Sequence, residues 1–211
     1  MSNITGSTPR SELEAVELNK ATIAAYEQYA RDYAQLVGSE PSPEWALALR
    51  RLDRIAPTGT VLEVGSGTGC DADYLEDVLG RRVRRTDATA AFRRIQAERG
   101  RTVEALNVMT DPLGGPYAAV VALCVLIHVP HDSLPAVLRR VHRSLKPSGV
   151  LLMSMREGEG VEQDGPWYTA LWRESELLPA ILRAGFLVEI RSLHVDSAAE
   201  SWLTYVLVKA A

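Results

Sequence analysis

A chain of 211 residues, 46% hydrophobic and 24% charged, has the size and composition of a globular protein with one well-buried core. Its formal net charge of -4 argues against a partner recruited by charge, so we expect neither nucleic acid nor an anionic membrane as partner. The longest apolar run, 117–127, is shorter than the ~20 residues of a membrane-spanning helix. The first ten residues lack the features of a secretory signal, and Cys70 and Cys124 are therefore expected to be reduced in a cytoplasmic protein.

The first quarter of the chain predicts a flexible start followed by helices. Residues 1–10 are polar and predict a flexible N-terminus. Apolar residues recur at helical spacing over 11–37 and again over 45–55, which predicts amphipathic helices on either side of two prolines. We therefore divide the chain into a flexible segment 1–10, a helical segment 11–56 and a larger unit 57–211.

In the larger unit, strand patterns and helix patterns alternate. Strands are expected over 61–64, 83–87, 102–106, 118–125 and 150–155, and helices over 71–79, 90–98, 134–145 and 176–184. The last two strands, 187–194 and 204–209, have no helix between them and should pair antiparallel. This order predicts a doubly wound, Rossmann-like α/β fold with a seven-stranded, mostly parallel sheet and an antiparallel terminal strand.

The first strand of this unit runs directly into glycines, in the sequence Val-Leu-Glu-Val-Gly-Ser-Gly-Thr-Gly-Cys over 61–70. Glycine lets a backbone turn sharply and approach a ligand closely, which is typical of nucleotide-type cofactor sites. Asp87 follows Gly65 by 22 residues, the spacing at which an acid from the next strand reaches ribose hydroxyls, although it is also suited to cap the helix that follows. A dinucleotide fingerprint reads G-x-G-x-x-G, whereas here the third glycine, Gly69, comes one place early and Glu63 lies inside the strand.

Five features in this order resemble the class I S-adenosylmethionine-dependent methyltransferases. The first is hydrophobic-Glu-hydrophobic-Gly-x-Gly-x-Gly over 62–69, which looks like motif I of that family, and the second is Asp87. Asn107-Val108, Leu123 to Pro130 and Leu145-Lys146-Pro147-Ser148-Gly149 resemble later family segments. Residues 25–33 further resemble the N-terminal helical lid of members that act on small molecules, so that 11–56 would be the lid and 57–211 the core.

The resemblance implies a set of residues that would hold S-adenosylmethionine, with S-adenosylhomocysteine as the product. They are Tyr26, Tyr33, Glu63, Gly65, Ser66, Gly67, Gly69, Asp87, Ala88, Asn107, Val108 and Leu123. Glu63 would either anchor the loop or reach the methionine amine through water. Asn107 replaces the usual Asp beside the adenine, which predicts weaker anchoring without a change of cofactor. Tyr26 and Tyr33 would either close over the cofactor or pack the lid on the core.

On the acceptor side, His128 is the candidate general base, because histidine titrates closest to neutral pH and this one follows a strand. An equally open alternative is a structural histidine at the strand–helix junction. Residues 155–160 and the aromatic segment beyond them are expected to roof the acceptor site, with Arg156, Glu157, Trp167 and Tyr168 as contacts, unless the aromatic residues belong to the core. No metal site is expected.

The resulting prediction is a monomeric or homodimeric enzyme that moves a methyl group to a nitrogen or oxygen of a small molecule, such as a natural-product intermediate. An NAD-dependent oxidoreductase shares the strand, loop and ribose acid, but the glycine spacing, Glu63 and the terminal hairpin argue against it. A methyltransferase-like subunit without turnover stays open. RNA methylation would need the eight arginines between Arg81 and Arg101 to face the site, whereas the acids beside them favour a solvated face.

Overall fold

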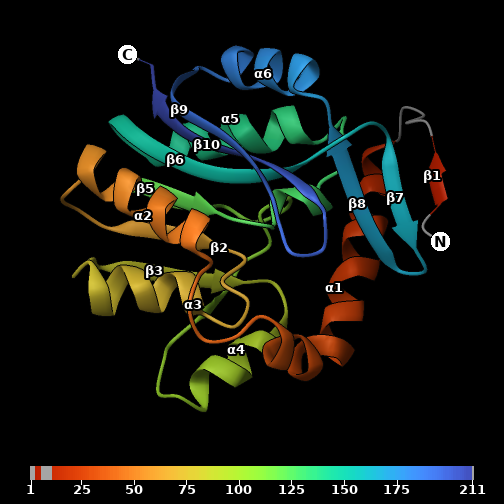
Figure 1. Cartoon of the computed structure of the whole chain (residues 1–211), viewed down its shortest axis with the longest axis horizontal. Helices are drawn as coiled ribbons and strands as arrows, with labels where there is room; N and C mark the ends of the chain where they lie inside the picture. The colour runs from red at the N-terminus through yellow and green to blue at the C-terminus, as the bar shows by residue number, and fades with distance from the viewer. Residues whose placement is uncertain (1–2, 6–10, 211) are drawn as a thin grey trace.

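The computed structural model describes residues 3–5 and 11–210, and its centre is a twisted, mostly parallel sheet (Figure 1). The sheet has ten strands in the described part of the chain, and the seven that correspond to the predicted strands lie in the order β4-β3-β2-β5-β6-β10-β9. Their bounds are β2 Val61–Val64, β3 Val83–Asp87, β4 Glu104–Ala105, β5 Tyr117–Ala122, β6 Leu145–Glu157, β9 Phe186–Val195 and β10 Ser201–Lys209. β10 runs antiparallel to both of its neighbours and the other pairs are parallel, so the predicted sheet is confirmed.

Helices cover both faces of the sheet, which explains why β5 is buried along its whole length. On one face α5 (Leu134–Ser144) and α6 (Glu174–Arg183) contribute Leu138 and Ile181 to the core around Leu151. On the other face α2 (Pro43–Ile55) contributes Leu49 and Leu52 to a second core cluster. The helix predicted over 71–79 belongs to this face and is a short α3 (Cys70–Asp73) that widens into the π-helical turn η1 (Tyr74–Val78).

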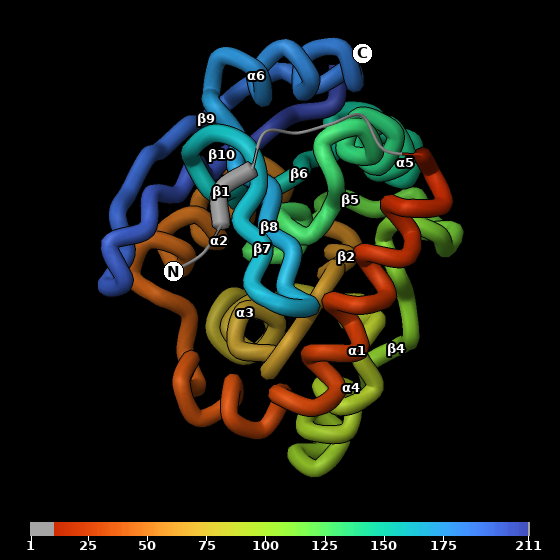
Figure 2. Tube along the Cα trace, turned by 90° about the vertical axis from the view of Figure 1, so that its right-hand side faces the viewer, coloured from red at the N-terminus to blue at the C-terminus, as the bar shows by residue number. Residues whose placement is uncertain are grey.

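The N-terminal segment forms one long helix, α1 (Glu12–Leu36), which begins at a capping box between Ser11 and Glu14. Tyr26, Ala30 and Tyr33 of α1 pack against Phe92 of α4 (Ala90–Ala97). Viewed from the carboxyl ends of the parallel strands, α1 lies across that edge of the sheet (Figure 2). In the described ranges no helix combines the length and the apolar character needed to cross a membrane.

A hairpin that the sequence analysis missed lies beside α1. β7 (Val161–Asp164) and β8 (Trp167–Trp172) pair antiparallel where a loop was expected, and the end of β8 runs parallel to the end of β6. β1 (Asn3–Thr5) extends this hairpin by pairing with β7, so these three residues of the predicted flexible segment 1–10 are a strand. The other residues of that segment lie outside the described part of the chain. Together α1 and the hairpin cover the carboxyl edge of the sheet (Figure 2).

Candidate active site

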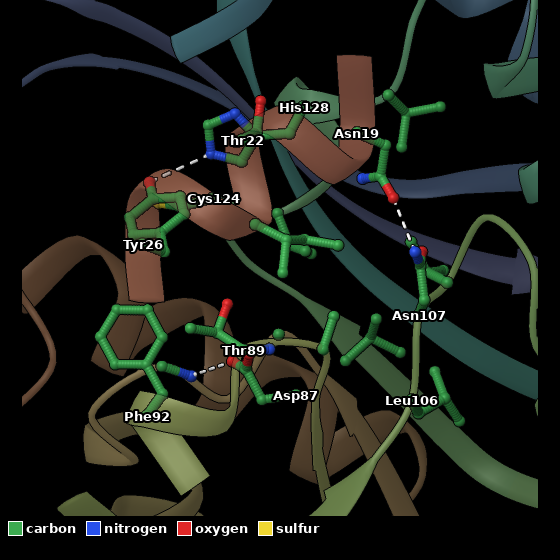
Figure 3. Close-up of a pocket in the computed structure, with 18 of the residues that line it drawn as sticks. Asn19, Thr22, Tyr26, Asp87, Thr89, Phe92, Leu106, Asn107, Cys124 and His128 are labelled. Atoms are coloured by element: carbon green, nitrogen blue, oxygen red, sulfur yellow. Dashed lines mark hydrogen bonds between the residues drawn. The ribbon is translucent and has the colours of Figure 1, made fainter. Parts of the chain in front are cut away.

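The carboxyl ends of β2 and β5 meet where the strand order of the sheet reverses, and a cavity of about 120 Å³ lies at this point under α1. Ligands of open α/β sheets bind in this kind of position. The cavity is lined by Asn19, Thr22, Ile23, Tyr26 and Tyr33 of α1, and by Val64, Gly65, Gly67, Asp87, Ala88, Thr89, Phe92, Leu106, Asn107, Val108, Leu123, Cys124, Val125, His128 and Val129 (Figure 3).

The glycine loop after β2 has the backbone shape that the sequence predicts. Gly65 adopts a positive φ of 68°, and a Cβ at this position would come within 2.5 Å of the Val125 side chain. Gly67 has a φ of 54°, and the nearest atom to a Cβ placed there is 4.0 Å away. The two glycines therefore have different structural roles. Gly65 lets two loops approach each other, whereas Gly67 presents its backbone, without a side chain, to the cavity.

Asp87, at the end of β3, ties the glycine loop to the loop before α4. Its Oδ2 accepts a hydrogen bond of 2.8 Å from the Gly67 N–H, and its Oδ1 accepts one of 2.7 Å from the Thr89 N–H. Burial raises the pKa of Asp87 above its ordinary value, and these two N–H groups oppose the shift. Each carboxylate oxygen keeps a second lone pair with which to accept a hydrogen bond from a ligand.

His128 lies on the opposite wall of the cavity, in the short 3-10 helix η2 (Leu126–His128) that follows β5. Its Nδ1 lies 2.7 Å from the Tyr168 carbonyl, which can only accept, so Nδ1 carries the proton. Its Nε2 therefore accepts the 3.2 Å hydrogen bond from the Tyr26 hydroxyl of α1 (Figure 3). Burial lowers the pKa of His128, and the neutral ring therefore has its free lone pair directed at Tyr26.

Two further polar contacts hold α1 over the cavity. Asn107 Nδ2 donates to Asn19 Oδ1 at 2.6 Å, while Asn107 Oδ1 accepts from the Met109 N–H (Figure 3). The Glu27 carboxylate accepts the N–H groups of Ala90 and Ala91 at the start of α4, where the N-cap residue makes no side-chain hydrogen bond of its own. With the bond between Tyr26 and His128, α1 thus contacts the loops that follow β3, β4 and β5.

Two carboxyl groups, of the buried Glu63 and the half-buried Asp71, flank the glycine loop in the sequence. Glu63 is 3% exposed, and neither its Oε2 nor the Oδ1 of Asp71 has a hydrogen-bond partner among the described residues. Burial raises the pKa of Glu63 to about 8 and that of Asp71 to about 6. Neither residue lines the cavity.

The structure brings most of the predicted cofactor residues together. Those that line the cavity are Tyr26, Tyr33, Gly65, Gly67, Asp87, Ala88, Asn107, Val108 and Leu123, with His128 beside them. Glu63, Ser66 and Gly69 are not among the lining residues. The sequence analysis missed Asn19, Thr22 and Ile23, although they precede Tyr26 at helical spacing on the same helix, which is the signal that would have found them.

The four predicted acceptor residues do not line the cavity either. Arg156 forms ion pairs with Glu200 at 2.6 Å and Glu162 at 3.6 Å and lies over the ring of Trp202. The Tyr168 side chain is 1% exposed, and this residue contributes its carbonyl to His128. Trp167 lies closest to the site, because its ring packs edge-on against Tyr26 with 4.7 Å between centroids. Glu157 pairs with the end of β8.

The arginines between 81 and 101 are largely engaged in ion pairs within the chain. Arg85 is 3% exposed and contacts Asp73 and Glu76, and Arg101 contacts the same two acids from the surface. Arg81 is also buried and paired with Asp53. The expectation of a solvated face is therefore wrong for Arg81 and Arg85. None of the eight arginines lines the cavity in the described part of the chain.

Comparison with known proteins agrees with this geometry. A protein-family model described as a methyltransferase domain matches residues 27–202, while a search of curated protein sequences finds no match. Among solved structures, the Burkholderia thailandensis 1,6-didemethyltoxoflavin-N1-methyltransferase, crystallised with 1,6-didemethyltoxoflavin and S-adenosylhomocysteine, is 18% identical with a TM-score of 0.79, over 100% of this chain and 95% of that one.

Two further structures have the same fold. The Synechocystis PCC 6803 magnesium protoporphyrin IX methyltransferase is 13% identical, with a TM-score of 0.70 over 92% of this chain and 100% of its own. The [4+2]-cyclase SpnF is 14% identical, with a TM-score of 0.64 over 100% of both chains, so the fold alone does not fix the reaction. The family-model match over most of the sequence is the decisive finding, and it confirms the resemblance seen in the sequence. The chain belongs to the methyltransferase-domain family.

Proposed function

We propose that this protein transfers the methyl group of S-adenosylmethionine to a nitrogen or oxygen of a small, uncharged molecule. The observation that carries the proposal is the meeting of the glycine loop and Asp87 in one cavity at the switch point of a methyltransferase-family sheet. The 1,6-didemethyltoxoflavin bound to the Burkholderia enzyme supports a small-molecule acceptor, including a natural-product intermediate.

The residues present fit the proposed cofactor. Gly67 has bare backbone on the cavity side, and Asp87 has lone pairs to accept hydrogen bonds from ribose hydroxyls. Phe92, Leu106 and Val108 provide apolar walls for an adenine ring. When bound, S-adenosylmethionine supplies a methyl group already activated by its sulfonium, so the chain has mainly to orient the acceptor and exclude water.

The helical segment 11–56 is proposed to act as a lid over the core 57–211. The cavity of about 120 Å³ is smaller than the ~300–1,000 Å³ of sites that hold small molecules, because side chains of α1 project into it. α1 must therefore shift for a nucleotide-sized ligand to bind. Such a shift would break the polar contacts of α1 to three loops, to the Pro166 carbonyl and to Glu98, each of which is made by a side chain of α1.

The lining of the cavity supports an uncharged acceptor. Asp87 is the one Asp, Glu, Lys or Arg side chain among its lining residues in the described part of the chain, and we assign it to the cofactor. A charged acceptor would be left without an ion-pair partner at a buried site, which is costly. Of the four predicted acceptor residues, Trp167 is the one we propose to contact the acceptor, through its position beside Tyr26. Arg156, Glu157 and Tyr168 would act through the hairpin.

His128 is proposed as the base that removes a proton from the acceptor. Its neutral ring offers the Nε2 lone pair where the Tyr26 hydroxyl now donates, so an acceptor hydroxyl or amine that replaced this contact would face a proton acceptor. We expect His128→Gln to lower kcat by about 10²-fold or more for an acceptor that is protonated at neutral pH. Unchanged turnover in single-turnover measurements would leave His128 with a structural role.

The test of the cofactor is calorimetric titration with S-adenosylhomocysteine, S-adenosylmethionine and NAD side by side. We expect the two sulfur compounds to bind and Asp87→Asn to weaken that binding by about 1.5–3 kcal/mol, because a charged hydrogen-bonding group is lost. Asp32→Asn, at an exposed position of α1, is the matched control. Binding of NAD alone would favour the oxidoreductase, and binding of none would favour a subunit without turnover.

Location, assembly and macromolecular partners also stay proposals. Both cysteines are free, which supports a reducing compartment such as the cytoplasm. We propose a monomer or homodimer, to be checked by light scattering. The ion-paired arginines support a small molecule over RNA as acceptor, and salt-sensitive binding of tRNA would contradict that.

A further inference from the structure

We propose that Gln96 is a positioning residue that holds the glycine loop in its ligand-binding shape through the carbonyl of Gly67. The inference rests on the proposed cofactor, because it assigns the loop to S-adenosylmethionine. Gln96 belongs to α4, is 0% exposed and does not line the cavity, so it acts through the loop.

The hydrogen bonds of the buried amide define its orientation. Gln96 Nε2 donates to Ser66 Oγ at 2.8 Å and to the Gly67 carbonyl at 3.0 Å, and Oε1 accepts from Arg85 Nη1 at 2.9 Å. A guanidinium only donates and a carbonyl only accepts, so the reversed amide would meet both partners with the wrong group. The amide therefore has one orientation, which aims a donor at the loop.

Two ion pairs fix the position of the Arg85 guanidinium. Its Nη2 forms ion pairs with Asp73 at 2.7 Å and Glu76 at 2.6 Å, and its side chain is buried. The guanidinium thus cannot leave Gln96 without giving up two carboxylates in a region of low exposure. A chain of polar contacts runs from the α3 and η1 acids through Arg85 and Gln96 to the loop, and Arg99 adds a hydrogen bond to the Thr68 carbonyl.

Gly67 is consequently held on both sides of the residue. Asp87 accepts its N–H and Gln96 donates to its C=O, while the cavity side stays bare. A glycine without these two bonds samples many backbone conformations. Because a ligand binds only the competent conformation, the apparent affinity falls in proportion to the fraction of the protein that has this conformation. Gln96 thus fixes the carbonyl of the residue whose N–H is fixed by Asp87.

The third glycine of the motif contacts the same amide. A Cβ on Gly69 would lie 2.5 Å from Gln96 Oε1 and 3.0 Å from Arg99 Nη2. Gly69 also adopts a positive φ of 89°, so glycine fits this position both through its backbone conformation and through the room that it leaves for Gln96.

Gln96→Glu tests the inference with little change of volume. The carboxylate keeps an acceptor for Arg85 but sets an oxygen against the Gly67 carbonyl. We expect the dissociation constant of S-adenosylhomocysteine to rise about tenfold in calorimetry, with a higher KM for S-adenosylmethionine and a kcat near wild type at saturation. Gln35→Glu, on the exposed side of α1, makes the same charge change and should leave the dissociation constant and the KM unchanged.

The outcomes separate the two proposals. If wild type does not bind S-adenosylhomocysteine, the proposed function fails, whereas equal binding by wild type and Gln96→Glu overturns the role of Gln96 alone. A loss of kcat at unchanged KM would also overturn it. Should Gln96→Glu not fold, hydrogen exchange of the wild type decides, because we expect the Gln96 side-chain NH2, which donates to Ser66 and Gly67, to be protected before ligand is added. Rapid exchange that slows with ligand would contradict a prepared loop.

Discussion

Glu63 is buried inside β2 with one oxygen that lacks a partner among the described residues, and burial raises its pKa from 4.5 to about 8. The unfolded chain therefore releases this proton at a lower pH than the folded chain does. The protonated Glu63 therefore contributes stability to the folded chain that is fully present below about pH 4.5. This contribution is lost as the pH rises through the folded-state pKa near 8. Asp71, with a pKa raised to about 6, adds a loss of the same sign at lower pH.

We expect Glu63→Gln to remove the larger part of this pH dependence. The free energy of unfolding of wild type should fall between pH 5 and pH 8 by up to about 1.4 kcal/mol per pH unit, whereas that of the variant should change less. Urea unfolding at several pH values measures both slopes. Glu189→Gln, exposed on β9, is the control, and parallel curves for wild type and Glu63→Gln would contradict the assignment.

At the scale of elements, the contact between α1 and α4 links the N-terminal helix to the helix beside the cavity. The start of α4 has unpaired N–H groups and a partial positive charge, and the Glu27 carboxylate supplies both the acceptor and the opposite charge. Because α4 also carries Gln96, the same helix contacts α1 at one end and the glycine loop at the other. α1 therefore caps the helix that contacts the glycine loop.

We expect Glu27→Ala to cost about 1 kcal/mol at the start of α4, as the loss of a cap does elsewhere. Hydrogen exchange should become faster for the amides of Ala90 and Ala91 and along α1, while β5 stays protected. Glu17→Ala removes an exposed glutamate of α1 that pairs with Lys20 and serves as the control. Unchanged exchange at Ala90 and Ala91 would show that Glu27 does not hold the lid.

The hairpin β7–β8 could not be predicted from the local sequence. Its strands are short and three glycines, Gly158, Gly160 and Gly165, surround them, so local preferences predict a loop. The strands form because β8 pairs with the end of β6 and packs beside α1, and these contacts join residues far apart in the chain. Local sequence patterns do not predict these tertiary contacts, so they do not predict the strands that depend on them.

For the whole molecule, the sheet was predictable because β2, β5 and β6 contain local apolar runs and the helices between strands dictate parallel order. Gly65, Gly67 and Asp87 were predictable for a similar reason, since their spacing is a property of a single β-α-β unit. The contacts of α1 were not, because Asn19 meets Asn107 across 88 positions of sequence. The lining of the cavity thus combines a local motif with a helix placed by tertiary packing.

The close approach of Gly69 to Gln96 has a consequence for related chains. A larger residue at 69 would have to adopt a positive φ of 89° and also displace the amide at 96, since its Cβ would lie 2.5 Å from Gln96 Oε1. In homologues the two positions should therefore change together, and a chain that keeps a glutamine at 96 should keep glycine at 69. Part of what is read as a cofactor signature would then record the history of a packing constraint between two positions 27 residues apart.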